Sequence, residues 1–275
     1  MKKLICALLI SLLVVAGCQS NEVVKETTPS SEKNIVNKER EPEADDTMIL
    51  YKFDNQNFTV THKSNSLVIE GKDYSIIVEE TKEKSGLEKG KYQSIIVERE
   101  GSTVTSKLKF TEEPDKINSL SFSDTNNYLA FTGFYSHLGN QLYIIDLNNG
   151  GTIDLLEKLT GLGYKRIETI HTYNWGPNKD VISFAFGDPS LSNLAIYDLN
   201  SNEITVIPTK SHFINTLSIM WHKKGDFIDY VVEENSDQFK LYRYDLKKSN
   251  FELIKEVSRD EFLRKYKQYT PDDLS

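Results

Sequence analysis

The residue types that perform catalysis or bind metals are present in this chain, but their spacing matches no catalytic motif. Zinc sites use histidines in H-E-x-x-H or H-x-H spacing, or histidines together with paired cysteines. None of the five histidines occurs in such an arrangement. A G-x-S-x-G elbow and a Walker-type phosphate loop are also missing from the sequence. We therefore assign no catalytic residue, no metal ligand and no cofactor. The histidines are His62, His137, His171, His212 and His222.

Acidic residues that lie close together in the sequence are the remaining candidates for chemistry. Their spacing fits no calcium-binding loop, so we interpret them as charged connections between strands, and we interpret His222 as an exposed turn residue. Carboxylates far apart in the sequence could still converge in space as the acid and base of a hydrolase. The two local groups are Asp226 with Asp229, and Glu233 and Glu234 with Asp237.

The N-terminus predicts export from the cytoplasm. Lys2 and Lys3 precede an apolar run over residues 4–15, and the small residues Ala16 and Gly17 separate that run from Cys18. The run is too short to span a bilayer as a helix, which favours a secretory signal.

Val15-Ala16-Gly17-Cys18 resembles the lipobox of bacterial lipoproteins. This resemblance implies that residues 1–17 are a signal peptide, that a diacylglyceryl group is attached to the Cys18 thiol, and that the lipid anchors the protein to the extracytoplasmic face of the cell membrane. Cys18 would then be the only cysteine of the mature chain, which excludes an internal disulfide.

Composition divides the remaining chain into three parts. Residues 18–47 are rich in Glu, Lys, Ser, Thr and Asn and predict a disordered tether, because they carry too little apolar surface to offset the entropy of ordering. Residues 48–112 predict a β-rich segment, and residues 113–275 predict propeller-like repeats with a C-terminal helix. The net charge of −8, without a concentrated basic patch, argues against nucleic-acid binding.

A short scheme occurs three times after residue 116. An aromatic residue closes a strand, a polar turn and an apolar strand follow, and a later strand ends in Asp-Leu 24, 23 and 24 residues after the aromatic. A period of roughly 50 residues predicts stacked β units of the kind that form propeller blades. Because these residues recur once in each repeat, we interpret the aspartates as turn-forming residues. We interpret the tryptophans as core residues rather than as platforms on which sugars stack. The pairs are Phe122 with Asp146, Trp175 with Asp198, and Trp221 with Asp245.

The second copy, Trp175-Gly-Pro-Asn-Lys, is similar to the blade repeats of TolB-like propellers, distant relatives of WD repeats. The third copy keeps the Trp and the Gly but lacks the Pro, and the first keeps the aromatic and a Ser. The resemblance implies four-stranded blades around a channel. Three copies do not close a ring, so we expect a small or incomplete propeller of about four to five blades.

The segment before the repeats predicts strands that would supply one or two degenerate blades; the alternative is a β-sandwich-like piece packed on a partial propeller. Gly71 and Gly101 are placed where tight hairpins need a positive φ. Residues 81–90 predict a loop, and residues 152–163 a short helix or an irregular outer strand. The expected strands are residues 49–53, 57–62, 66–70, 74–79, 93–99 and 103–110.

At the other end, Ser258 and Glu261 form a capping-box pattern that opens a helix over residues 259–269, stopped by Pro271. Phe262, Tyr266 and Tyr269 share one face, which we expect to pack on the propeller rather than on anionic lipid.

We expect a non-catalytic, membrane-anchored binding protein whose partner is an envelope protein or a ligand. The loops 133–141 and 188–192 differ between the copies and are the expected contact sites. The alternative is a cell-envelope hydrolase with carboxylates at the propeller mouth. A sensor acting on a membrane partner is indistinguishable from the first hypothesis at the level of sequence.

Overall fold

A computed structural model describes residues 48–49, 59–80, 92–99, 101–107, 114–188, 191–208 and 215–267. Its contacts divide the chain into two units, Met1–Lys38 and Glu39–Ser275, and every described residue belongs to the second. The signal peptide predicted over residues 1–17, the lipidation site Cys18, the tether predicted over 18–47 and the loop predicted over 81–90 lie outside the described residues.

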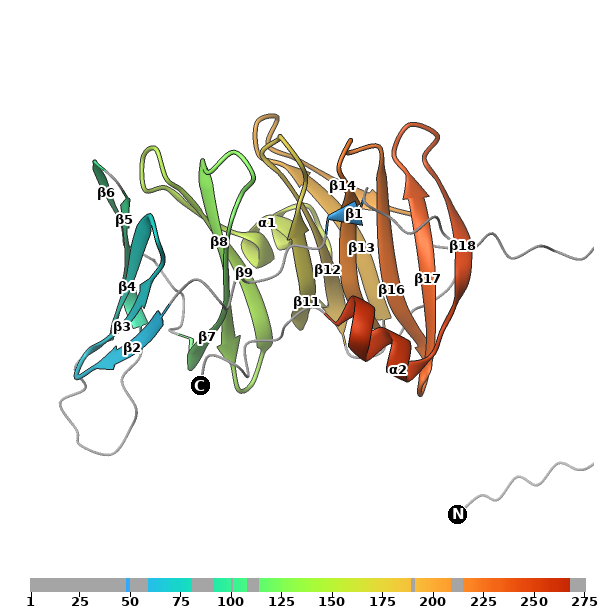
Figure 1. Cartoon of the computed structure of the whole chain (residues 1–275), viewed down its shortest axis with the longest axis horizontal. Coiled ribbons are helices and arrows are strands. Elements are labelled where there is room, and N and C mark those ends of the chain that lie inside the picture. The colour runs from blue at the N-terminus through green and yellow to red at the C-terminus, as the bar shows by residue number, and fades with distance from the viewer. Residues whose placement is uncertain are drawn as a thin grey trace, which may run out of the picture. The chain divides into compact units, whose positions relative to one another are not determined.

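The described chain consists almost entirely of antiparallel strands in four sheets (Figure 1), which confirms the all-β, propeller-like fold class. Within each sheet the strands pair in chain order. The first sheet comprises β2 (Thr59–Lys63), β3 (Ser66–Glu70), β4 (Tyr74–Glu80), β5 (Tyr92–Arg99) and β6 (Ser102–Lys107). The second comprises β7 (Lys116–Phe122), β8 (Tyr128–Tyr135), β9 (Gly139–Asp146) and β10 (Thr152–Asp154). The third comprises β11 (Thr169–Trp175), β12 (Val181–Asp188), β13 (Leu191–Asp198) and β14 (Glu203–Ile207).

The fourth sheet joins the first and the last strands of the described chain. It contains β15 (Asn215–His222), β16 (Phe227–Asn235), β17 (Gln238–Asp245) and β18 (Asn250–Val257), and β1 (Met48–Ile49) pairs with the free edge of β15. The chain therefore starts on the fourth sheet before it continues into the first sheet at β2. The part of the segment 48–112 that is described forms β1 and one five-stranded sheet.

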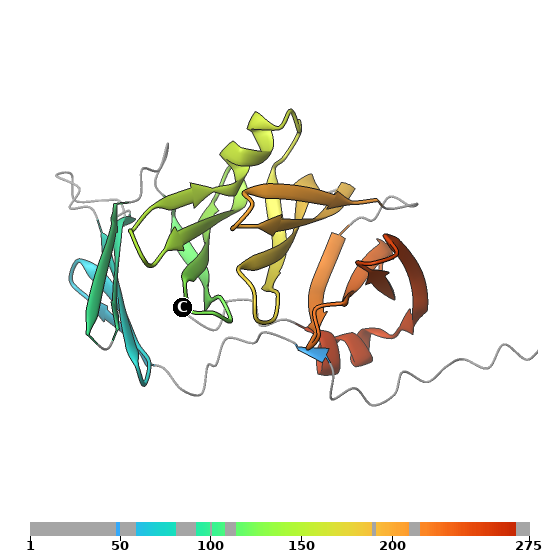
Figure 2. The same cartoon turned by 90° about the horizontal axis from the view of Figure 1, so that it is seen from above.

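Successive sheets pack face to face. One core cluster joins the first and second sheets, the next joins the second and third, and another joins the third and fourth. Figure 2 shows the four sheets following one another, with the first and the fourth at the two ends of the row. An apolar strand such as residues 142–145 is buried on both of its faces, as its composition predicts.

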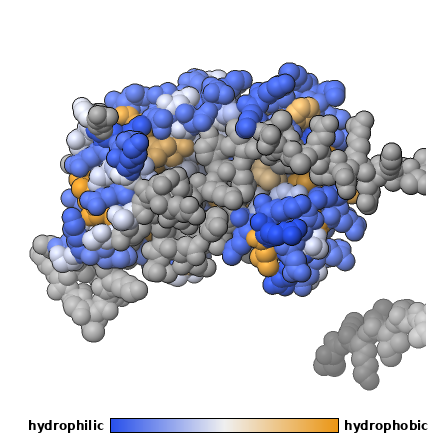
Figure 3. Space-filling view, in the orientation of Figure 1, coloured by the Kyte–Doolittle hydropathy of each residue, from blue (hydrophilic) through white to orange (hydrophobic). Residues whose placement is uncertain are grey.

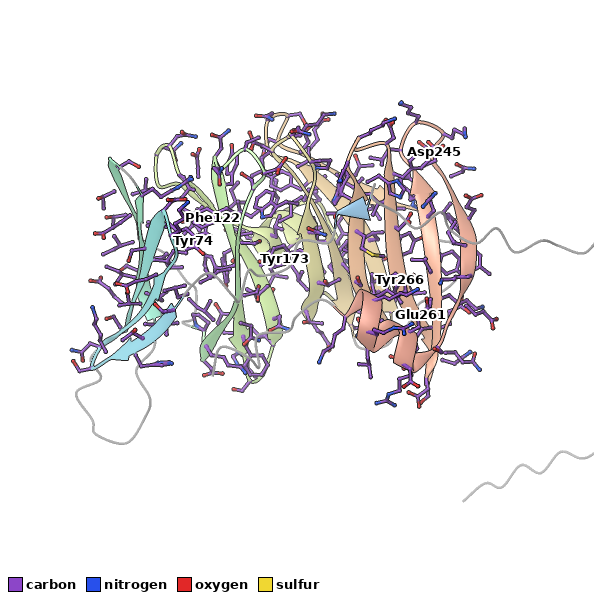
Figure 4. The ribbon with its side chains drawn as sticks, in the orientation of Figure 1. Tyr74, Phe122, Tyr173, Asp245, Glu261 and Tyr266 are labelled. Carbon is purple, nitrogen blue, oxygen red and sulfur yellow. The ribbon has the colours of Figure 1, made fainter. Side chains whose placement is uncertain are left out.

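The repeated aromatic residues hold each sheet to the one before it. The Trp175 indole Nε1 donates to the Ser121 Oγ at 3.1 Å, and the Trp221 Nε1 donates to the Ser183 Oγ at 2.8 Å. Both tryptophans are buried, which confirms their packing role. Phe122, which carries no N–H, instead packs edge-on against the Tyr74 ring of the first sheet, with ring centroids 4.8 Å apart (Figure 4).

The repeated aspartates form turns, as predicted. The carboxylates of Asp146, Asp198 and Asp245 each accept a hydrogen bond from the backbone N–H two residues ahead, at 2.8, 2.9 and 3.0 Å. This common role explains why an aspartate recurs at the end of β9, β13 and β17.

The two hairpin glycines of the first sheet have different roles. Gly101 adopts a φ of 78°, as predicted. The prediction of a positive φ for Gly71 is wrong. A Cβ at that position would overlap the Tyr74 ring, so the residue is needed for close approach of an aromatic side chain rather than for a left-handed backbone.

Both helical predictions are confirmed in part. Residues 152–163 contain β10 followed by α1 (Leu155–Gly161), whose N-terminus is capped by the Asp154 carboxylate. The Ser258 Oγ caps α2 (Arg259–Glu261), which continues as a π-helical turn, η1 (Phe262–Tyr266). The described helix ends at Tyr266, where Lys267 leaves the helical conformation, and the expected end at Tyr269 lies outside the described residues.

The C-terminal helix packs on the free face of the fourth sheet, as predicted. The Phe262 ring stacks on the Phe239 ring at 5.3 Å, and Tyr266 is buried in the same cluster (Figure 4). The Glu261 side chain does not complete a capping box; its Oε1 binds the amines of Lys255 at 2.6 Å and Lys265 at 3.1 Å. The pair with Lys255 fixes the helix to β18, whereas the pair with Lys265 lies within the helix.

Candidate functional site

The loops expected to contact a partner turn out to be mostly sheet. Residues 133–141 belong largely to β8 and β9, which meet in a tight turn, and the Gln141 side chain is buried. Residues 188–192 join β12 to β13, and Ser192 is buried against Thr216 of the fourth sheet, with their hydroxyl oxygens 2.9 Å apart. Residues 136–138 form an exposed turn, so the expectation that these segments contact a partner stays a prediction.

Two of the polar residues interpreted as exposed are instead buried on the fourth sheet. The Asp229 carboxylate is inaccessible to solvent, and the Arg243 guanidinium binds it through two hydrogen bonds of 2.8 and 2.9 Å. The His222 Nε2 lies 3.3 Å from the same carboxylate. The sequence interpretation was wrong because the three residues lie on three different strands and meet on one face of the sheet.

Burial by itself would raise the pKa of Asp229. The hydrogen bonds and positive charge of Arg243, with a further contribution from His222, outweigh this effect and hold the pKa of the carboxyl below its ordinary value. The cluster therefore consists of a buried ion pair with a histidine beside it. It stabilises the sheet, and we do not assign it a catalytic role.

The turns between the second and third sheets are tied together by side chains. The Thr125 hydroxyl and the Asn127 amide donate to the Asp180 carboxylate, and the Asn178 backbone N–H donates to the Asp124 carboxylate at 2.6 Å. These hydrogen bonds join the turns of the two sheets at one end of the junction.

The corresponding junction between the third and fourth sheets is arranged differently. Asp226 occupies the position in the fourth sheet that Asp180 occupies in the third, five residues after the tryptophan. Its carboxylate binds the Lys247 amine of its own sheet at 2.9 Å. The two turns come close at Gly225 and Pro177, where a Cβ on Gly225 would lie 3.5 Å from the Pro177 ring.

A groove of about 350 Å³ opens at this junction, and it is our candidate site. Trp221 and Tyr244 contribute its aromatic part, and Gly176 lies beside the Trp221 indole, where a Cβ would make an ordinary contact at 3.4 Å. The rim is polar. The hydrogen-bonding side chains that line the groove are Lys179, Asp198, Ser201, Glu203, Thr205 and Ser249.

The chemistry of this lining suits binding. Aromatic surface, hydroxyl groups and charges of both signs can hold a ligand that is partly apolar and partly hydrogen-bonding. Among the described residues that line the groove there is no His or Cys. Asp198 and Glu203 are cross-strand neighbours on one face of β13 and β14, so two carboxylates do stand together here.

In the described part of the chain, no group of three or more His, Cys, Asp or Glu side chains is placed to hold a metal ion. The described helices are also too short and too polar to cross a bilayer. The face shown in Figure 3 is mainly hydrophilic, with small separate hydrophobic areas.

No family model and no curated protein sequence matches the chain. Among solved structures, a protein assigned as TolB from Agrobacterium tumefaciens is 11% identical, with a TM-score of 0.39 over 74% of this chain and 78% of that one. TolB from Acinetobacter baumannii is 10% identical, with a TM-score of 0.40 over 77% and 52% of the two chains. A chain of the nidogen/laminin complex is 10% identical, with a TM-score of 0.39 over 70% and 62%.

Proposed function

We propose that this protein is a membrane-anchored binding module that holds a partner protein or ligand on the extracytoplasmic side of the cell membrane. The observation that carries the binding role is the groove between the third and fourth sheets. It opens where the copies of the repeat differ. Asp180 binds the turn of the preceding sheet, whereas Asp226 binds Lys247 of its own sheet. Two recurring residues, Trp221 and Asp198, also line the groove, but one packs against the third sheet and the other forms a turn.

Filling the groove tests the binding role. Replacing Ser201 by Trp, at an exposed turn position that lines the groove, should reduce recovery of a cross-linked envelope partner about tenfold or more without changing the thermal midpoint. A matched control, Ser136→Trp, places the same side chain in an exposed turn of the second sheet. Equal partner recovery from the two variants and the unchanged protein would reject the groove.

The anchor is supported by Cys18 and the apolar run before it. We expect Cys18→Ala to abolish incorporation of labelled fatty acid and to move the protein from the membrane fraction to the soluble fraction, because the lipid supplies the membrane affinity. Fractionation of cells expressing each form measures this outcome. Retention of the variant in the membrane fraction would contradict a lipid anchor at Cys18.

A hydrolase is the second candidate, and the pairing of Asp198 with Glu203 is the observation in its favour. The Asp198 Oδ1 already accepts hydrogen bonds from the backbone N–H groups of Asn200 and Ser201, as a turn-forming residue does. We favour binding for this reason. Release of reducing sugar or peptide from purified cell wall, lost in Glu203→Gln, would establish the hydrolase instead.

A further inference from the structure

The outermost strand of the third sheet has an open edge that lacks the usual protection against pairing. In the described part of the chain β14 pairs with β13 alone, and its register with β13 contains no bulge. Alternate residues of such a strand direct their backbone N–H and C=O groups to the open edge. The strand reads Glu-Ile-Thr-Val-Ile, with four β-branched residues and one charge.

The outer strands of the other sheets are protected. β10 has three residues, and β18 carries Glu252, Lys255 and Glu256 and is bulged against β17. The outer strand of the first sheet, β6, contacts the second sheet through Ser106, whose Oγ lies 2.6 Å from the Thr152 Oγ1. Short length, charge and bulges are the means by which proteins prevent edge pairing, and β14 has little of any of them.

Two cavities border β14, and Glu203 and Thr205 line both of them. The groove lies on one face, where Glu203 and Thr205 line it. A second cavity, of about 550 Å³, lies toward α1 and is lined by Lys158, Gly161, Leu162, Asn202, Glu203, Ile204 and Thr205. Because successive side chains of a strand point to opposite faces, a strand added beside β14 would place its side chains alternately in the two cavities.

The two cavities favour different side chains. In the second, the Lys158 amine is engaged by the Asn202 Oδ1 at 2.6 Å and lies over the Tyr197 ring at 4.9 Å, while Leu162 is 57% exposed beside Ile204. Leu162 and Ile204 are the part of this mostly polar cavity that an apolar side chain would contact. On the groove side, the neighbouring carboxylates of Asp198 and Glu203 outnumber the one lining cation, Lys179, and suit a basic side chain.

We propose that β14 receives an extended segment of a partner protein as an additional strand, with basic side chains toward the groove and apolar side chains toward Leu162. The inference rests on the binding role proposed above and names the chemistry of the partner. Backbone hydrogen bonds to the β14 edge would supply affinity, and the two cavities would supply selectivity.

The test uses the full chain and a short synthetic peptide of alternating valine and lysine, with fluorescence anisotropy as the readout. N-methyl groups on alternate residues block the N–H groups on one edge of the peptide only. We expect methylation of one set of residues to weaken binding about tenfold or more and methylation of the other set to have little effect. A peptide with glutamate in place of lysine should bind at least about tenfold more weakly than the original.

A charge change on the protein completes the test. Glu203→Lys should weaken binding of the valine–lysine peptide, whereas Glu252→Lys, the same change on the exposed edge strand β18, should not. Equal loss in both variants, or equal effects of the two methylation patterns, would overturn strand pairing at β14, as would absence of binding. If binding ignores the methylation pattern and is lost in Ser201→Trp, the groove role stands and the strand proposal alone fails.

Discussion

Replacing Arg243 by Met is expected to lower the free energy of unfolding by about 3–5 kcal/mol, because it leaves the buried Asp229 carboxylate without its main partner. Chemical denaturation at neutral pH measures this loss. His222, at 3.3 Å from the carboxylate, does not replace the two hydrogen bonds of the guanidinium.

The pH dependence of the stability loss tests whether the buried charge of Asp229 causes that loss. Asp229 has a pKa below its ordinary value of 3.8, so in the unchanged protein its contribution to stability is present above that value and is lost as the pH falls through the folded-state pKa. In Arg243→Met, burial favours the neutral carboxyl. The difference between the two proteins should therefore shrink at acid pH, where the carboxyl of the variant is protonated.

Two further variants are controls for this prediction. Asp229→Leu combined with Arg243→Met removes both charges and should recover most of the lost stability. Lys265→Met breaks an exposed ion pair with Glu261 and should leave the unfolding midpoint unchanged. A single Arg243→Met variant as stable as the unchanged protein at neutral pH would contradict the structure of this cluster.

Replacing Trp175 by Ala is expected to cost about 3–5 kcal/mol, since it empties a fully buried position between the second and third sheets. Because the sheets contact their neighbours in order, the loss should also uncouple the two halves of the row and broaden the unfolding transition. Calorimetry, compared with fluorescence of the remaining Trp221, measures both effects.

Trp175→Phe separates packing from hydrogen bonding. It keeps an aromatic ring, as Phe122 does in the first copy, but removes the N–H that reaches Ser121. We expect a loss of about 1–2 kcal/mol from the unpaired acceptor and the smaller ring. Tyr164→Ala, at an aromatic that is 37% exposed and packs edge-on against Phe186, should change stability less. Equal stability of the Trp175→Ala and Tyr164→Ala variants would contradict the packing role.

The parts of the fold that depend on local pattern were predictable from the sequence. The aromatic and Asp-Leu positions of the repeats, the doubly buried strands and the Ser258 cap are set by residues close together in the chain. Pairing of β1 with β15 was not predictable, because a two-residue strand carries no pattern of its own.

The errors came from contacts that sequence spacing does not show. From its sequence neighbours Asp229 was interpreted as a loop residue, but neighbouring strands place Arg243 and His222 beside it. Gly71 was predicted to need a positive φ in a turn, but the structure shows that the Tyr74 ring lies against it. The groove likewise arises from a difference between two sheet junctions. The sequence expectation named the segments 133–141 and 188–192 and did not include the turns at Asp180 and Asp226, whose difference becomes visible only through contacts between sheets.

The most direct test of the binding role is cross-linking in intact cells. A photo-reactive amino acid is placed at Thr205, exposed on the rim of the groove, and in a second strain at Thr103, exposed on β6 of the first sheet. We predict one envelope protein attached at Thr205 and not at Thr103, and reduced attachment when the Thr205 substitution is combined with Ser201→Trp. The same products from both positions, or none from Thr205, would contradict the binding site between the third and fourth sheets.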